Sequence, residues 1–322
     1  MSPASLTTSS TAPDPLPSAP LGRTARWAFP ILVVGLIFGS FSPIFLRLSE
    51  TGPVATAAAR MIGQLPFFVI IALIQPKFRA EVGGGLARKD VMLLLASGVF
   101  FAGDLIAWYW AVMVTSVANG TFLANLTPIF VAVGSWLLFG ERLTRSFGVG
   151  AALAIGGSVF MMSENWSGVQ TAHNPWGDAS AVCAAVFYAG YVLTVASARQ
   201  RASTLATMAI SGVSCAIVLT AVALAWEPAF WPHTTNGWLA IAGLVIIVQI
   251  GGQSMIAMAL AHLPANLTAL MFLFQPAIPA AAAWWLFGER ITMTQVIGVV
   301  FILIGLIFAR RATRTAAAPA EA

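Results

Sequence analysis

Long apolar runs alternate with short polar segments along almost the whole chain. From Trp27 onward each apolar run is continuous and about 20 residues long, which as a helix matches the hydrocarbon thickness of a bilayer. A membrane β-barrel would instead show alternating positions in segments of about ten residues. The pattern predicts an all-α polytopic membrane protein with ten transmembrane helices, near residues 27–47, 53–75, 90–113, 116–139, 144–163, 178–198, 204–226, 237–260, 264–287 and 292–310.

One phrase of this pattern occurs twice. Residues 136–143 read Trp-Leu-Leu-Phe-Gly-Glu-Arg-Leu and residues 284–291 read Trp-Trp-Leu-Phe-Gly-Glu-Arg-Ile, so a shift of 148 positions makes six of eight residues identical. The same shift aligns Pro128 with Pro276. It also aligns three pairs of glycines: Gly103 with Gly251, Gly150 with Gly298 and Gly157 with Gly305. A period of this length indicates a duplicated domain rather than a solenoid repeat.

The polar segments divide the chain around this duplication. Residues 1–22 are rich in Ser, Thr, Pro and Ala and contain no apolar run, which predicts a disordered cytoplasmic tail. We expect a first five-helix repeat in 27–163, a periplasmic linker in 164–177 and a second repeat in 178–310. Residues 311–322 form a second cytoplasmic tail in this interpretation.

Composition supports lipid as the natural solvent. Hydrophobic residues make up 59% of the 322 residues and charged residues 8%, against about 25% charge in a soluble domain. Eleven Trp and 28 Gly are typical of helical membrane proteins, where Trp lies at interfaces and Gly permits close helix packing. The net charge of +5 comes from loop residues, so we expect a lipid bilayer and no nucleic acid as partner.

The basic residues predict the topology, because Lys and Arg are retained on the cytoplasmic side. With the N-terminus inside, 13 of the 16 Lys and Arg residues fall in cytoplasmic segments; Arg47 and Arg290 fall outside and Arg60 lies within a helix. Both termini are therefore predicted to be cytoplasmic. Five helices in each repeat then force the second copy to enter the membrane the other way up, as in secondary transporters whose substrate site lies near the midplane between halves.

Two ionisable residues lie inside the predicted helices, where charge is costly. Arg60 in the second helix and Asp104 in the third differ in depth by only about 5 Å at the helical rise per residue. One interpretation is a buried ion pair that locks two helices. The other makes Asp104 a proton-coupling carboxylate or a clamp for a substrate ammonium group.

Other polar and aromatic side chains fall at similar depth on several helices. Trp108 is four residues after Asp104 and shares its helix face, whereas Tyr109 and Trp110 are expected at the membrane interface. The remaining candidates for a central chamber are Ser40, Asn125, Tyr188, Tyr191, Gln249, Gln253 and Gln275. For each of them, an ordinary interhelical hydrogen bond is the alternative to a role in substrate binding.

The matched prolines are predicted to lie in mid-helix. Proline removes a backbone hydrogen bond, so Pro128 and Pro276 indicate either two gating hinges or static curvature. The Glu141–Arg142 and Glu289–Arg290 pairs are expected to end helices and fix short turns. No catalytic or nucleotide-binding motif accompanies them, and the chain predicts no cofactor, no metal site and no ATP motor.

These features resemble a known family. Two inverted halves, each with a proline in its fourth helix and a Leu-Phe-Gly-Glu-Arg turn before its fifth, are similar to the drug/metabolite transporter superfamily and its EamA-type exporters. The resemblance covers residues 27–311, and Arg60 in the second helix also matches it. It implies a bacterial inner-membrane carrier for amino acids or small metabolites, with a cavity lined chiefly by helices 1, 3, 4, 6, 8 and 9. Within that family, the Trp- and Tyr-rich central helices look most like aromatic amino-acid exporters of the YddG type.

Three functional hypotheses follow. The leading one is a secondary transporter that exports amino acids or similar small metabolites by alternating access, either coupled to protons through Asp104 or by facilitated diffusion. The second is a multidrug exporter of cationic aromatic compounds. The third is a non-transporting membrane enzyme or scaffold.

Overall fold

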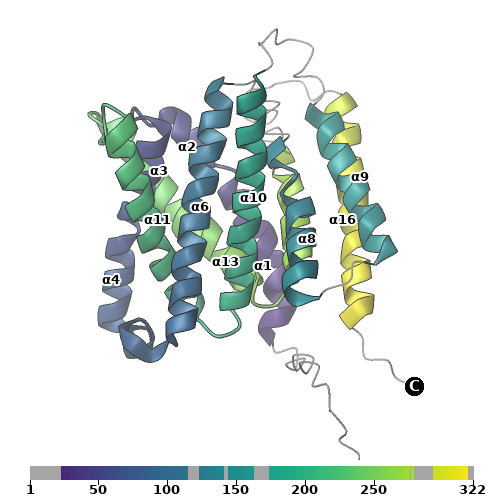
Figure 1. Ribbon diagram of the computed structural model, residues 1–322, viewed down its shortest axis with the longest axis horizontal. Coiled ribbons are helices and arrows are strands. Elements are labelled where there is room, and N and C mark those ends of the chain that lie inside the picture. Colours follow the sequence, from purple (N-terminus) through teal and green to yellow (C-terminus); the bar gives the residue numbers. More distant parts are fainter. Residues whose placement is uncertain are drawn as a thin grey trace, which may run out of the picture.

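A computed structural model describes residues 23–114, 123–140, 144–162, 174–275, 277–278 and 293–317. Throughout these ranges the regular structure is helical, and the helices stand side by side as one slab (Figure 1). The predicted all-α class is confirmed. The helices of the first half are α1 Arg23–Gly39, α2 Ser42–Leu48, α3 Pro53–Gly63, α4 Leu65–Ile74, α5 Pro76–Ala80, η1 Glu81–Gly85, α6 Arg88–Val114, α8 Thr127–Phe139 and α9 Arg145–Met162.

The second half repeats the plan with its own interruptions. Its helices are α10 Pro175–Ala198, α11 Thr204–Trp226, α12 Thr235–Gly243, η3 Leu244–Gln253, α13 Ser254–Ala259, α14 Ala265–Met271, η4 Phe272–Phe274 and α16 Met293–Ala317. Every predicted span has a helical counterpart among them. Among the described residues, six helical spans are long and apolar enough to cross a membrane, and α8, α9 and the 265–274 segment are shorter apolar helices. The predicted tail at 311–322 is helical as far as Ala317, because α16 continues past the predicted end of its span. The predicted tail at 1–22, residues 318–322, the turns at 141–143 and 288–290, and most of the linker lie outside the described residues.

Several predicted spans are broken rather than continuous. The first span divides between α1 and α2, and the second divides at Gln64 between α3 and α4. In both cases a proline, Pro43 or Pro66, occupies the first turn of the new helix. Proline lacks an N–H group, so it is tolerated where a helix begins but costs a hydrogen bond inside one. The first of these breaks lies beside Gly39 and Ser42, which border the cavity described below.

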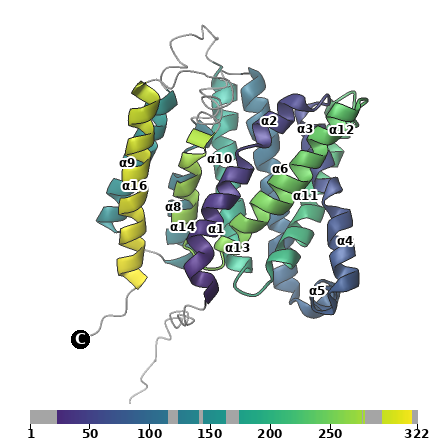
Figure 2. The same cartoon turned by 180° about the vertical axis from the view of Figure 1, so that it is seen from behind.

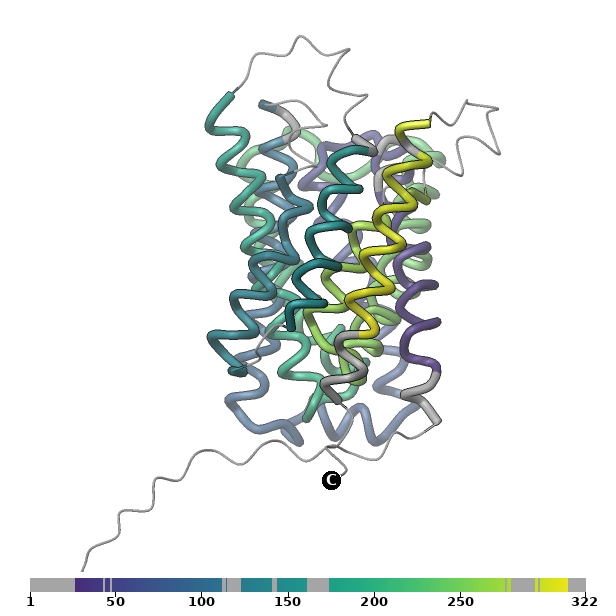
Figure 3. Tube along the Cα trace, turned by 90° about the vertical axis from the view of Figure 1, so that its right-hand side faces the viewer, coloured from purple at the N-terminus to yellow at the C-terminus, as the bar shows by residue number. Residues whose placement is uncertain are grey.

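The two halves run in opposite directions. In Figure 1, α1 begins and α16 ends on the same side of the slab, as an even number of spans requires. The last helices of the two repeats, α9 and α16, pack against one another in antiparallel orientation at one edge of the molecule (Figure 3). In Figure 2, α1 lies against α13, while α10 lies against α6 in Figure 1. First-half helices therefore pack against second-half helices across the middle of the molecule.

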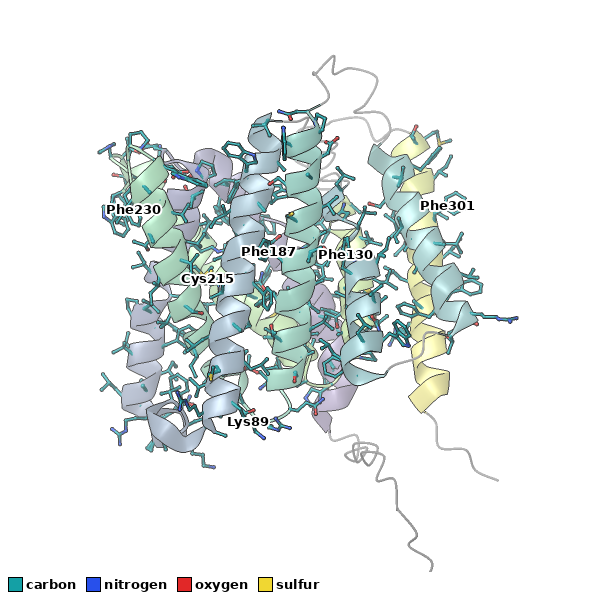
Figure 4. All side chains as sticks on the ribbon, viewed as in Figure 1. Lys89, Phe130, Phe187, Cys215, Phe230 and Phe301 are labelled. Carbon is teal, nitrogen blue, oxygen red and sulfur yellow. The ribbon has the colours of Figure 1, made fainter. Side chains whose placement is uncertain are left out.

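Two glycines that the duplication makes equivalent, Gly103 and Gly251, each pack against an aromatic ring from a neighbouring helix. A side chain added at Gly103 on α6 would meet the ring of Phe187 on α10, which Figure 4 labels at that helix pair. Gly251 on η3 faces the ring of Phe38 on α1, in the equivalent helix pair of the other half. Glycine has no side chain, so each helix pair approaches closely enough for the ring to fill the contact. Packing thus repeats along with sequence.

Candidate functional site

A cavity of about 210 Å³ lies where the two halves meet. Both halves contribute to its wall, and α6 supplies four residues at helical spacing on one face: Phe101, Asp104, Leu105 and Trp108. Its other lining residues include Gly39, Ser42, Arg60, Asn125, Thr127, Pro128, Tyr188, Gln253, Phe272 and Gln275. Eight of the twelve residues expected to form the site or its hinges therefore border one space.

Asp104 places a carboxylate on this cavity from the middle of α6. Its side chain is half-buried, and no described residue donates a hydrogen bond to it. Arg60 is the cation with which it interacts electrostatically. A carboxylate held inside a membrane without hydrogen-bond donors favours a cationic or protonated partner.

Arg60 places a guanidinium group on the same cavity from α3. Its Nη1 donates a hydrogen bond of 3.4 Å to Ser42 Oγ, and its Cζ lies 5.6 Å from the centre of the Phe101 ring. Its Nε is buried with no hydrogen-bond partner. The direct ion pair envisaged between Arg60 and Asp104 does not form, because no nitrogen–oxygen distance between them is within 4.0 Å. The two opposite charges instead border one space separately.

An aromatic cluster supports the Arg60 side of the cavity. Phe101 stacks on Tyr191 with ring centres 4.7 Å apart and planes inclined by 24°. Tyr188 lies edge-on to Phe272, 5.1 Å away, and also packs against Tyr191. Offset and edge-on contacts of this kind hold rings in fixed orientation. They give the cavity an aromatic wall beside the Arg60 guanidinium group.

Three amides border the cavity and a fourth does not. Asn125, Gln253 and Gln275 are lining residues. Gln249 lies elsewhere, where its Nε2 donates a 3.2 Å hydrogen bond to Oε1 of buried Gln64. Gln253 ends the π-helical segment η3, and its Oε1 is buried without a partner. Wide π-helical turns often occur at functional sites, since they change the direction of the side chains that follow.

The structure places other predicted residues away from the cavity. Ser40 Oγ donates to the Leu36 carbonyl within its own helix, and Tyr191 lies behind Phe101. Tyr109, expected at the interface, is buried in the core beside Trp108. Trp110, expected there with it, is 49% exposed and packs against Trp226, so of the two residues only Tyr109 is buried.

Pro128 also differs from its expected position. It lies in the first turn of α8, which begins at Thr127, and not in the middle of a continuous helix. The helix is interrupted by a turn just before Pro128, where the Thr127 hydroxyl donates a hydrogen bond of 2.8 Å to the Ala124 carbonyl. Its expected counterpart Pro276 is outside the described residues.

Sequence reasoning missed several lining residues, including Ser42, Phe101 and Phe272. Phe101 could have been predicted from the sequence, because it precedes Asp104 by three residues and therefore shares its helix face. Ser42 was not, because its position depends on the break between α1 and α2. Within the described part of the chain, no group of three His, Cys, Asp or Glu residues is placed to hold a metal ion.

Inverted halves that enclose a polar cavity near the centre define a membrane transporter. Comparison with known proteins gives the same class. The model of the EamA-like transporter family matches residues 25–163 and again residues 175–311, once per half. The chain belongs to the EamA-like transporter family.

Individual relatives are distant. Pseudopaline exporter CntI from two Pseudomonas aeruginosa strains is 25% identical over 231 residues, covering 70% of this chain and 78% of CntI. Uncharacterized transporter YwfM of Bacillus subtilis is 25% identical over 223 residues, covering 67% of this chain and 74% of YwfM. One crystal structure superposes with a TM-score of 0.70 at 18% identity, covering 89% of this chain and 98% of that one, which shows a shared fold.

Proposed function

We propose that this protein is a secondary transporter that exports amino acids or similar small metabolites across a bacterial inner membrane. The observation that carries the proposal is the central cavity, which a carboxylate, a guanidinium group, three amides and an aromatic wall border together. A solute with both polar and apolar parts matches such a lining. The name of CntI as an exporter supports the outward direction.

The cavity volume favours small solutes over the multidrug alternative. Pockets for drug-sized ligands enclose about 300–1,000 Å³, whereas this cavity encloses about 210 Å³. Multidrug transport of bulky aromatic cations would require a larger space or considerable rearrangement.

The two halves supply the means of alternating access. Inverted repeats that exchange conformations expose a central site first to one side and then to the other. The concentration of Lys and Arg in the segments on the side of both termini supports a cytoplasmic location for that side. Substrate would then enter from the cytoplasm.

Counterflow in proteoliposomes tests the proposal. Vesicles that contain the purified protein and an unlabelled neutral amino acid should accumulate the labelled amino acid above the level of protein-free vesicles. Lack of exchange across a panel of neutral amino acids would overturn the proposal. Inclusion of a cationic aromatic dye as a competitor separates the multidrug alternative, which predicts strong competition by the dye.

A further inference from the structure

Two buried polar atoms beside the cavity lack partners, and they are of opposite kinds. Arg60 Nε is a hydrogen-bond donor and Gln253 Oε1 is an acceptor, and each is fully shielded from solvent. Arg60 is 5% exposed and Gln253 is 8% exposed, and both residues border the cavity. Buried polar groups in proteins almost always have partners, so Arg60 and Gln253 both retain hydrogen-bonding capacity that the described residues do not use, at the edge of one cavity.

The two charged residues of the cavity also differ in kind: Arg60 offers hydrogen-bond donors and a positive charge, and Asp104 offers acceptors and a negative charge. Arg60 has five N–H donors, and among the described residues it donates one hydrogen bond, to Ser42 Oγ at 3.4 Å. Asp104, which has no hydrogen-bond donor among the described residues, adds an acceptor on α6. If the two residues formed a contact ion pair, they would neutralise each other. Because they border the cavity separately, each retains capacity for an opposite charge on a ligand.

We infer that Arg60 binds the carboxylate and that Asp104 and Gln253 bind the ammonium group of a zwitterionic α-amino acid. This inference rests on the proposed transport function and assigns a substrate class to the same site. A guanidinium group matches a carboxylate because it offers paired N–H groups in a planar fork. The carboxylate of Asp104 and the amide oxygen of Gln253 provide acceptors for ammonium hydrogens. The amino-acid side chain then lies against Trp108, Tyr188 and Phe272.

Phe101 is a positioning residue in this arrangement. The guanidinium group lies 5.6 Å from the centre of its ring, and the ring itself is stacked on Tyr191. The Phe101 ring attracts the guanidinium group through its aromatic face, and this contact does not use the N–H donors of Arg60. Those donors remain available for a carboxylate.

The test is a set of matched ligands on the purified wild-type protein. L-Phenylalanine, L-phenylalaninamide, 2-phenylethylamine and 3-phenylpropanoate share one aromatic group and differ in which charges they carry, and L-leucine with isopentylamine repeats the comparison. Binding is measured by tryptophan fluorescence and thermal stabilisation, and exchange by counterflow. The zwitterions should bind at least about tenfold more tightly than the amide, the amines and the acid, since each of these lacks one charge-assisted contact. Equal binding of amine and amino acid, or no binding of either amino acid, would overturn the assignment.

Substitutions should test the contacts of Arg60 and Asp104 separately. Arg60→Gln should weaken L-phenylalanine binding by about tenfold or more and leave 2-phenylethylamine unchanged, and Arg60→Lys should recover part of the loss. Asp104→Asn should weaken both L-phenylalanine and 2-phenylethylamine while leaving 3-phenylpropanoate unchanged. Arg201→Gln is the matched control, because Arg201 pairs with Asp90 away from the cavity. A purely structural role for Arg60 would change all ligands alike.

Failure of this inference and failure of the proposed function are distinguishable. Amino acids that bind with the expected selectivity but do not exchange would remove transport and leave the assignment intact. Exchange that is indifferent to the carboxylate, with Arg60→Gln equal to wild type, would retain transport and remove the assignment. The wild-type ligand series decides the question even if a substituted protein fails to fold.

Discussion

Gly150 on α9 lies against the backbone of Gly305 on α16, so closely that an added Cβ would be 2.6 Å from the Gly305 carbonyl oxygen. Gly157 meets Gly298 with the same 2.6 Å separation. The 148-residue shift converts one contact into the other, since it maps Gly150 to Gly298 and Gly157 to Gly305. This helix pair is therefore a two-fold contact within one chain, built from small residues as membrane helix interfaces commonly are.

Substitution of these glycines should destabilise the protein in a position-specific way. Gly157→Ala should lower the free energy of unfolding by about 1–3 kcal/mol, because the methyl group overlaps backbone atoms that cannot rotate away. Gly156→Ala, one residue earlier in the same helix, meets nothing within 4 Å and is the matched control. It should be neutral or stabilising by up to about 1 kcal/mol. Thermal unfolding of both variants in detergent measures the difference, and equal losses would contradict the packing described.

Glu227 should matter for the start of α3, although it is distant in sequence. Its two carboxylate oxygens accept hydrogen bonds from the N–H groups of Val54 at 2.9 Å and Ala55 at 2.7 Å. These N–H groups have no partner within the helix, and the helix dipole also favours a negative charge there. Glu227→Ala should cost about 1–3 kcal/mol of stability. Glu227→Gln retains one acceptor oxygen and should lose less, and chemical unfolding curves of the two variants should rank them in that order.

Glu50 makes the reciprocal contact from the first half to the second, and it introduces a pH dependence. Its carboxylate accepts hydrogen bonds from the Thr234 hydroxyl and from the N–H groups of Thr234 and His233. The Thr234 hydroxyl first, and then these N–H groups and the charge of His233, lower the pKa of Glu50 below its usual 4.5. A lowered pKa in the folded protein means that this contribution is complete above pH 4.5 and disappears as pH falls through the folded value.

Acid unfolding tests the Glu50 contact. In wild type, the midpoint of thermal unfolding should fall as pH decreases below 4.5, because protonation of Glu50 removes its contacts with the start of α12. Glu50→Gln should have a lower midpoint at neutral pH and a flatter dependence on pH below 4.5. An identical acid limb in the two proteins would show that the Glu50 contacts contribute nothing to stability.

Asp104→Asn should separate transport from proton coupling. If a substrate ammonium and a proton compete for the Asp104 carboxylate, an inward proton gradient should accelerate export by wild type. Asn cannot be protonated in this range, so the variant should show the same slow exchange with and without a gradient. Flux in proteoliposomes with an imposed pH gradient measures this effect. Asp90→Asn, outside the cavity, is the control and should keep the gradient response; a gradient response retained by Asp104→Asn would exclude it as the coupling residue.

Much of the architecture could be predicted, because lipid imposes a simple rule. Each span must satisfy its own backbone hydrogen bonds, so its length and polarity are visible in the sequence. The duplicated phrase and the distribution of Lys and Arg then indicated inverted halves. Residues on one helix face were also predictable: Asp104 and Trp108 border the same cavity because they are separated by one turn of α6.

Relationships between helices were harder to predict. Similar depth allowed an ion pair between Arg60 and Asp104 as one of two alternatives, yet Arg60 hydrogen-bonds to Ser42 from a different helix. Gln249 and Gln253 are one helical turn apart in sequence, but one bonds to Gln64 and the other borders the cavity. Depth in the membrane does not specify the rotation of a helix about its axis, which depends on how its neighbours pack.

The spans, the duplication and the charged residues within the membrane can be identified from the amino-acid sequence, because each depends on local polarity and spacing. That Arg60 and Asp104 border one cavity without forming an ion pair becomes visible only in the folded protein. The helix break before Pro43 places Ser42 where it accepts a hydrogen bond from Arg60, and the rotation of α6 turns Asp104 toward the same cavity. These are properties of packing between distant segments, and no single stretch of the chain contains them.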